Sequence, residues 1–235
     1  MNGTAAESHF ELRARMRAQG LVVGPDGPIV AAGHPAADAV RRVIDVLVAA
    51  AALAVLAPAL AVIMAFVRLE SPGPPVFRQR RCGRGGHEFE VVKLRTMIDG
   101  AARIGPGLAI DKGDARITRV GRVLRRTSID ELPQLVNILR GEMTLVGPRP
   151  TLPHQVAAYD ARQRERLLVK PGVTGWAQVH GRTTLSWPER IELDRWYVAN
   201  RSLRLDLRII LKTIGVVLGG EGVERDGRAW VEPPS

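Results

Sequence analysis

Two adjacent carboxylates, Asp130 and Glu131, form the densest chemical feature of the sequence, and Arg125 precedes them at close range. The pattern around them predicts the start of a helix. One interpretation is structural. Ser128 and Glu131 have the spacing of a capping box, and acids in a first helical turn complement the helix dipole.

Pro133 argues against that capping box, because a helix capped by Ser128 would place the proline where intrahelical hydrogen bonds should already form. A helix that begins at Asp130 avoids the conflict. Asp130 would then lie beside N-terminal amides and Arg125, an environment that keeps a carboxylate ionised and also binds phosphate. An ionised aspartate is a competent nucleophile toward phosphorus, and a divalent ion would offset its repulsion from a diphosphate.

Two later segments contain candidate binding residues. In residues 146–150, prolines on both sides of Arg149 restrict the backbone and hold the guanidinium in place. A phosphate clamp and a plain surface loop are both open interpretations of this segment. Residues 170–182 include turn residues, Trp176 and His180, which suit a nucleotide or headgroup pocket and equally suit a structural loop. A single histidine outside a recognised constellation is assigned no catalytic role.

A long apolar segment precedes all of these residues. Residues 46–67 contain no charged side chain and are flanked by Arg42 and Arg68. About 20 apolar residues suffice to cross a bilayer. Arginines at both ends disagree with a simple span, which favours positive charge on one side, and Pro58 bends the helix. We therefore expect a re-entrant membrane helix over residues 39–69, with a spanning helix as the alternative.

The remaining pattern predicts a mostly α fold with a small β-hairpin. Residues 76–81 and 89–95 alternate as two short strands. Helical periodicity is expected near residues 117–126, 130–140, 153–167, 187–200 and 204–218. The aromatic and arginine residues between Trp187 and Tyr197 suit a helix in the membrane interface, or an amphipathic helix packed on a protein core.

Three regions follow from this pattern. Residues 1–38 are rich in turn residues and predict a flexible N-terminal extension. Residues 39–69 are the expected membrane helix, and residues 70–235 are the expected catalytic domain. The single cysteine, Cys82, excludes an intrachain disulfide and a cysteine-built metal site.

The formal charge of +10 and the pI near 11.0 predict attraction to polyanions. Nucleic acids, anionic lipids and phosphorylated substrates all belong to that class. Aromatic residues make up only 4% and no recognised DNA or RNA motif occurs, so no nucleic-acid partner is expected. A non-catalytic basic membrane anchor or scaffold is the main alternative to an enzyme, and it predicts that Asp130 is dispensable.

From about residue 41 to about residue 217 the chain resembles the bacterial sugar transferases, which are small monotopic phosphoglycosyl transferases. The resemblance rests on Arg41-Arg42-Val43-Ile44-Asp45, Pro58, Lys93-Leu94-Arg95-Thr96-Met97, Ser128-Ile129-Asp130-Glu131-Leu132-Pro133-Gln134, Gly141-Glu142-Met143-Thr144-Leu145-Val146-Gly147-Pro148-Arg149-Pro150 and Pro171-Gly172-Val173-Thr174-Gly175-Trp176-Ala177-Gln178. Two positions depart from it. Ala57 stands where the family often has serine before the proline, and His180 replaces a common asparagine.

The resemblance implies a monotopic enzyme with a re-entrant helix on the cytoplasmic face of the bacterial inner membrane. It implies a Mg²⁺-dependent transfer of sugar-1-phosphate from a UDP-sugar to polyprenyl phosphate through a covalent aspartyl-phosphosugar intermediate, as the first membrane step of exopolysaccharide or other glycoconjugate assembly. Asp130 would be the nucleophile that expels UMP, and Glu131 its partner for metal placement or proton handling. Arg125 and Arg149 would contact phosphate. The sugar, the lipid length, the oligomeric state and the final glycan are not specified.

Overall fold

The computed structural model describes residues 9–21, 27–33, 35–101, 113–181 and 185–218. Its elements in chain order are α1 (His9–Ala18), α2 (Pro35–Glu70), β1 (Val76–Cys82), η1 (Arg84–Gly86), β2 (Glu88–Leu94), α3 (Arg119–Thr127), η3 (Ile129–Gln134), α4 (Leu135–Arg140), β3 (Thr144–Val146), α5 (Pro153–Ala157), α6 (Ala161–Arg164), η4 (Glu165–Leu168), β4 (Gly172–Thr174), α7 (Trp176–Val179), α8 (Trp187–Asn200) and α9 (Leu203–Leu218). The expected mostly α fold with a β-hairpin is confirmed.

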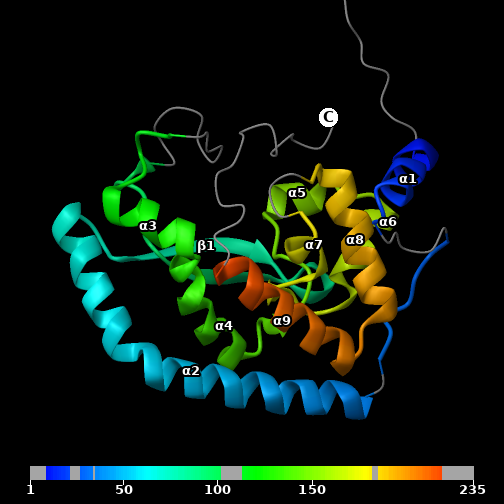
Figure 1. Ribbon diagram of the computed structural model, residues 1–235, viewed down its shortest axis with the longest axis horizontal. Helices are drawn as coiled ribbons and strands as arrows, with labels where there is room; N and C mark the ends of the chain where they lie inside the picture. The colour runs from blue at the N-terminus through cyan, green and yellow to red at the C-terminus, as the bar shows by residue number, and fades with distance from the viewer. Residues whose placement is uncertain (1–8, 22–26, 34, 102–112, 182–184, 219–235) are drawn as a thin grey trace, which may run out of the picture.

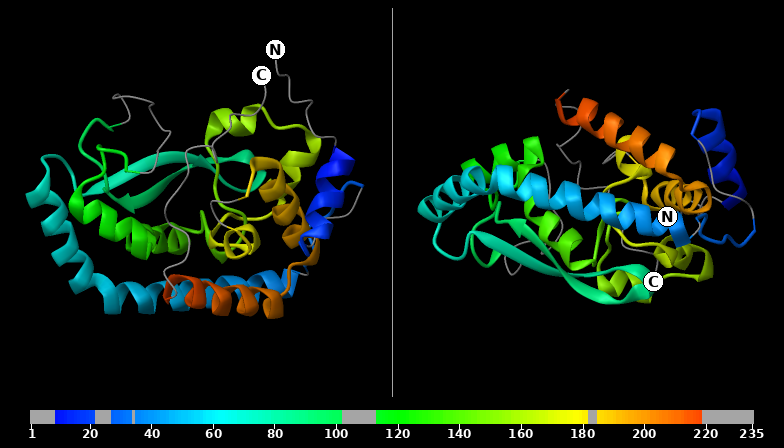
Figure 2. Two further views of the ribbon diagram at one scale, coloured as in Figure 1. Left: turned by 45° about the horizontal axis from the view of Figure 1, so that its top comes forward. Right: turned by 90° about the horizontal axis from the view of Figure 1, so that it is seen from below.

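Helix α2 runs along one edge of the molecule and bends, so that its C-terminal part turns towards α3 (Figures 1 and 2). Its buried residues form one narrow stripe: Asp45, Ala49, Leu60 and Val67. The stripe packs against β2, α3 and α4. The most apolar stretch of 18 residues in α2 has a mean hydropathy of 2.7, and only 11% of that stretch is buried. Such an apolar, uncovered helix is typical of membrane contact.

The hairpin supports the segment that carries the two acids. Strands β1 and β2 pair antiparallel from Val76 opposite Leu94 to Cys82 opposite Glu88. Buried Asn137 on α4 accepts a hydrogen bond from the Val92 amide at 3.1 Å and donates one to the Glu90 carbonyl at 2.6 Å. Because α4 directly follows η3, these bonds fix the acid segment against β2.

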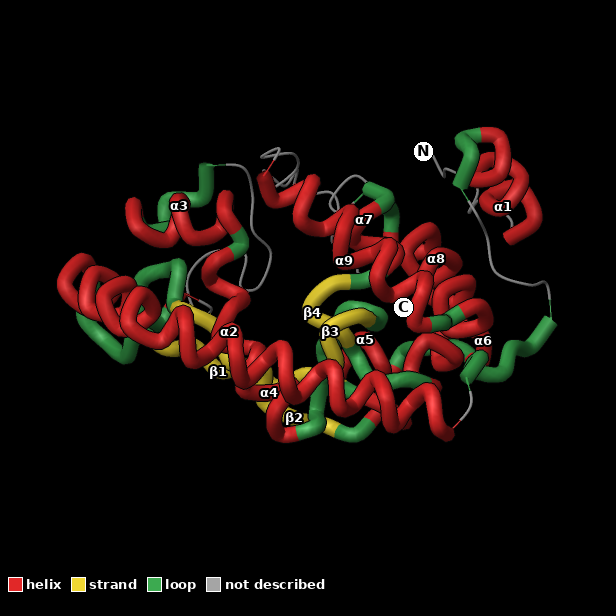
Figure 3. The backbone as a smooth tube through the Cα atoms, turned by 60° about the horizontal axis from the view of Figure 1, so that its bottom comes forward, coloured by secondary structure: helices red, strands yellow, loops and turns green. Residues whose placement is uncertain are grey.

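A second sheet, absent from the sequence-based expectation, joins β3 and β4 in parallel. Three residues per strand are too few to show alternation. The two strands lie side by side near the middle of the molecule in Figure 3. A Cβ atom on Gly147 would lie 2.5 Å from the Lys170 carbonyl, and one on Gly172 would lie 2.1 Å from the Gly147 amide. Only glycine allows this backbone contact.

The helix expected over residues 153–167 is divided into α5, α6 and η4. The Asp160 carboxylate accepts from the Gln163 amide at 2.7 Å and so starts a new helix. Helix α8 has eight buried residues, including Arg195 and Tyr197, so it packs in the protein core and is not interfacial. Helix α9 instead exposes an apolar face: Leu203, Leu207, Leu211 and Ile214.

Part of the segment expected to be flexible is folded. Within residues 1–38, helix α1 places Leu12 and Met16 in the same core cluster as Leu193 and Val198 of α8. At α1 the structure differs from the expected flexible extension, and residues 1–8, 22–26 and 34 of that segment lie outside the described residues. The sequence showed turn residues and charge there, and the apolar contacts with α8 could not be read from local periodicity.

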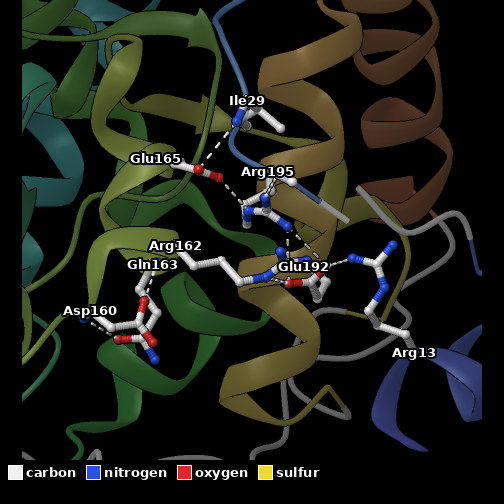
Figure 4. A network of polar contacts seen from close by, with 9 residues as sticks. Arg13, Ile29, Asp160, Arg162, Gln163, Glu165, Glu192 and Arg195 are labelled. Carbon is white, nitrogen blue, oxygen red and sulfur yellow. Dashed lines mark hydrogen bonds and ion pairs between the residues drawn. The ribbon is translucent and has the colours of Figure 1, made fainter. Parts of the chain in front are cut away.

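Buried charges reinforce this contact (Figure 4). Glu192 on α8 lies 3.3 Å from Arg13 on α1, 2.9 Å from Arg162 and 3.4 Å from Arg195. Arg195 also pairs with Glu165 at 2.6 Å. Glu192 is thus one anion that neutralises cations from three elements.

Glu192→Gln should destabilise the fold by about 3–5 kcal/mol, because it removes the counter-charge of buried arginines. The matched change Glu88→Gln alters a pair with Arg80 that is more than half exposed and should cost under about 1 kcal/mol. Denaturant unfolding in detergent measures both. Equal midpoints for the two variants would contradict the role given to Glu192.

Candidate active site

The chain enters the acid segment through a left-handed residue. Helix α3 ends at Thr127, and Ser128 has φ 58° before η3 begins. Among the described residues other than glycine, Ser128 alone has a positive φ, a conformation that costs about 1–3 kcal/mol and is concentrated at functional sites. Ser128 makes no side-chain cap bond. Both the capping box and a helix start at Asp130 are therefore wrong; a 3₁₀ turn accommodates Pro133.

Glu131 is held between two cations from distant parts of the chain. Its Oε1 lies 2.7 Å from Lys93 Nζ on β2 and 2.5 Å from Arg149 Nη2, and its Oε2 accepts from Arg149 Nη1 at 3.1 Å. Burial opposes ionisation, but the charges of Arg149 and Lys93 hold the pKa of Glu131 well below its usual range. Glu131 is therefore a fixed anion at neutral pH.

Lys93 was missed as a site residue. In sequence it is one charged residue of a strand, opposite Phe77, and such residues usually face solvent. In the structure burial lowers the pKa of Lys93, while Glu131 opposes that change. Only the approach of η3 to β2, which depends on long-range packing, identifies Lys93 as part of the site.

Asp130 differs from its neighbour. Burial, followed by the charge of Glu131, raises the pKa of Asp130 to about 6, although Lys93, Arg125 and Arg149 act against the change. The cations act in the expected direction, but burial and Glu131 outweigh them, so the pKa of Asp130 lies above its usual value. At neutral pH most Asp130 is still ionised. Within the described part of the chain, no group donates a hydrogen bond to its carboxylate, which leaves it available for reaction.

The loop with Arg149 is fixed by two other arginines. Arg166 donates to the Arg149 carbonyl at 3.0 Å and pairs with buried Asp194 at 2.6 Å. Arg81 donates to the Pro150 carbonyl at 3.3 Å. Burial, followed by the charge of Arg149, lowers the pKa of Arg81 to about 10. The restricted backbone expected around Arg149 is thus supported by side-chain contacts.

Arg125 lies within electrostatic range of the same acids. Burial lowers the pKa of Arg125, and Asp130 is the strongest of the charges that raise it. The structure therefore gathers all four predicted site residues, with Glu131 and Arg149 in direct contact. Lys93 and Arg81 add to the positive charge around the two acids. A group of cations of this kind suits the binding of a diphosphate.

The site has few metal donors. Across the described ranges, no cluster of three or more histidine, cysteine, aspartate or glutamate side chains could hold a metal ion. Mg²⁺ is commonly held by one or two carboxylates together with substrate phosphates. Asp130 fits that arrangement, whereas Glu131 would first have to release Lys93 or Arg149.

The third predicted segment has a packing role at His180. The His180 ring lies 3.8 Å from the Trp176 ring, with Nδ1 2.8 Å from the Trp176 carbonyl and Nε2 3.0 Å from Lys212 Nζ. Burial lowers the pKa of His180 and favours the neutral ring. These contacts give no reason to treat His180 as a catalytic base.

Glu131→Gln should lower the pKa of Asp130, because it removes the second-largest cause of the upward shift and leaves Lys93 and Arg149 with one fewer anion. The carboxyl titration of ¹³C-labelled aspartate in metal-free protein measures this pKa. Glu142→Gln, whose partner is Asn137, is the control and should leave it near 6. An unchanged or higher pKa in Glu131→Gln would refute this coupling.

Comparison with known proteins identifies the family. The family model described as bacterial sugar transferase matches residues 36–220. The uncharacterized sugar transferase EpsL of Bacillus subtilis is 44% identical over 169 residues, which are 72% of this chain and 82% of that protein. UDP-glucose:undecaprenyl-phosphate glucose-1-phosphate transferase of Caulobacter vibrioides is 45% identical over 207 residues, 84% of this chain and 76% of that protein.

A third relative is a longer protein. UDP-N-acetylgalactosamine-undecaprenyl-phosphate N-acetylgalactosaminephosphotransferase of Aeromonas hydrophila is 41% identical over 192 residues, which are 78% of this chain and 44% of that protein. The matched region of this chain contains α2, the acid segment and the Arg149 loop. The chain belongs to the bacterial sugar transferase family.

Proposed function

We propose that this chain transfers a sugar-1-phosphate from a UDP-sugar to polyprenyl phosphate through a covalent intermediate on Asp130, releasing UMP. The observation that carries the proposal is the contrast between the two acids. Glu131 is neutralised by Lys93 and Arg149, whereas Asp130 stands beside the same cations and accepts no hydrogen bond from the residues that the structure describes. The printed activities of the Caulobacter and Aeromonas relatives support this reaction class.

Binding comes first. Lys93 and Arg149 are the groups placed to receive the diphosphate, and Arg125 is close enough to share its charge. In the free protein Glu131 keeps both cations in place, so little reorganisation is needed when an anion arrives. Glu131 therefore acts as the residue that orients the phosphate-binding side chains.

The chemical step is a displacement at the phosphorus that carries the sugar. An Asp130 carboxylate oxygen forms a bond to that phosphorus, the bond to the bridging oxygen breaks, and UMP leaves with the electron pair. A phosphate oxygen of polyprenyl phosphate then attacks the same phosphorus. The Asp130 carboxylate is released, and the product is a polyprenyl diphosphate-sugar.

Asp130 and Glu131 are the carboxylates that would hold Mg²⁺ together with the substrate's diphosphate oxygens. The ion would reduce the repulsion between the nucleophile and the diphosphate. Because both Glu131 oxygens already accept hydrogen bonds, Asp130 is the stronger candidate ligand in the free protein.

The membrane arrangement that fits this reaction is monotopic. Arginines at both ends of α2, the bend in its axis and Pro58 within it support a re-entrant helix that returns to the cytoplasmic face of the inner membrane. The exposed apolar face of α9 supports a second contact in the interface. This arrangement would bring residues 70–235 to the surface where a polyprenyl phosphate headgroup lies.

The donor is proposed only as a UDP-sugar. The Caulobacter relative is named for glucose and the Aeromonas relative for N-acetylgalactosamine, so similarity at this level does not select a sugar. Two proteins similar to this chain, one from Rhizobium meliloti and one from Sinorhizobium fredii, are named exopolysaccharide production proteins. Their names support exopolysaccharide assembly as the setting.

Asp130→Asn should reduce UMP release from the accepted UDP-sugar by at least about 10³-fold, because the amide cannot form the covalent intermediate. The assay uses detergent-extracted protein with Mg²⁺, undecaprenyl phosphate and a panel of UDP-sugars. Asp160→Asn is the matched control, since Asp160 caps α6 and asparagine also caps a helix. Equal UMP release by native protein and Asp130→Asn would reject Asp130 as the nucleophile and favour a scaffold.

A further inference from the structure

Asp45 is a buried carboxylate in a helix that is otherwise apolar beyond its first turns. Asp45 is 5% exposed, and α2 contains no further charged residue between Asp45 and Arg68. Its Oδ1 accepts from the Leu145 amide at 2.9 Å, and its Oδ2 accepts from the Thr144 hydroxyl at 2.7 Å. No ion pair of Asp45 occurs within the described ranges. Both hydrogen-bond partners are neutral, and Arg42 and Lys170 act on Asp45 through their charges without forming an ion pair with it. A buried acid held in this way is costly for stability alone.

Both partners of Asp45 belong to β3, and β3 leads directly to Arg149. Only Val146, Gly147 and Pro148 separate Leu145 from Arg149. Gly147 is held tightly against Lys170 and Gly172, so this part of the chain has little freedom to absorb a shift. A displacement of Leu145 would therefore be transmitted to the Arg149 loop.

A second route links the start of α2 to the same strand. Arg41 pairs with Asp206 at 2.5 Å, and the Tyr197 hydroxyl lies 2.7 Å from Asp206 and 3.0 Å from the Val146 carbonyl. The carbonyl of Val146 and the amide of Leu145 are thus both fixed by groups that depend on α2.

The N-terminal part of α2 also contacts α4, the helix that follows the segment with Asp130 and Glu131. Arg42 donates to the Ile138 carbonyl at 2.5 Å and to the Leu139 carbonyl at 2.8 Å, at the C-terminal end of α4. Helix α4 continues from η3, which carries Asp130 and Glu131. A cation at a helix C-terminus is stabilising, so this contact fixes the axial position of α4.

We infer that Asp45 is a positioning residue: by holding β3 against the membrane helix beside the Arg42 contact, it sets the place of Arg149 relative to Asp130 and Glu131. The inference rests on the proposed function, because it concerns the residues of that reaction. Under this inference, catalysis depends on how α2 packs against β3 and α4. Activity should then respond to a change at α2 that touches neither substrate nor reacting atoms.

The test compares Asp45→Leu, Asp45→Asn and Asp38→Asn. Asp45→Leu removes both acceptors, whereas Asp45→Asn keeps an oxygen for the Leu145 amide. Asp38→Asn is the matched control, because Asp38 lies in the first turn of α2 and pairs with Arg41 and Arg201, not with β3. The measurements are kcat and KM for the accepted UDP-sugar, per folded protein, and hydrogen exchange of the peptide that contains residues 144–150.

Asp45→Leu should lower kcat about 10- to 100-fold, as expected for a shift of about 1 Å among reacting groups, and should speed exchange at Leu145. Asp45→Asn should recover most of kcat, and Asp38→Asn should match the native protein. Thr144→Val should add little to Asp45→Leu, since the bond between Thr144 and Asp45 is already lost in Asp45→Leu. Native kcat in folded Asp45→Leu would overturn the inference, as would faster exchange at Leu145 with kcat unchanged.

Absence of UMP release by the native protein with every donor would instead count against the proposed function. In that case hydrogen exchange still tests the seating of β3 by Asp45. Native exchange at Leu145 in Asp45→Leu would refute the positioning role without reference to activity.

Discussion

The site depends on the need to neutralise one partly buried acid. Lys93 from β2 and Arg149 from the loop after β3 bind Glu131 and hold it in the ionised form. That requirement draws three segments together that lie far apart in the sequence. Asp130 differs from Glu131, because burial, followed by the charge of Glu131, raises the pKa of Asp130, and Lys93 and Arg149 already bind Glu131.

Helix α2 supports this arrangement through contacts at both of its ends. At its N-terminal end Arg42 and Asp45 bind α4 and β3, which continue from the acid segment and lead to Arg149. At its C-terminal end Arg95, two residues after Lys93, binds the carbonyls of Val67 and Ser71. Both ends of α2 are therefore attached next to residues of the site, and its apolar outer surface is left uncovered in the structure.

The sequence predicted what depends on local pattern. The hairpin, α3, α8, α9 and the apolar helix follow from periodicity, and the motifs indicated Asp130, Glu131, Arg125 and Arg149. Features that depend on distant contacts were missed or wrong. Lys93 needed the approach of η3 to β2, α1 needed its contacts with α8, and the raised pKa of Asp130 needed burial that no motif reports.

The most direct test of the central claim is to locate the sugar-phosphate on the protein. Native enzyme is incubated with Mg²⁺ and the accepted UDP-sugar, without lipid, then quenched and cleaved after arginine. The peptide of residues 127–140 contains both acids. Fragmentation should place one sugar-phosphate on Asp130, and undecaprenyl phosphate should remove it. A sugar-phosphate on Glu131, or UMP release with no modified peptide, would contradict the account.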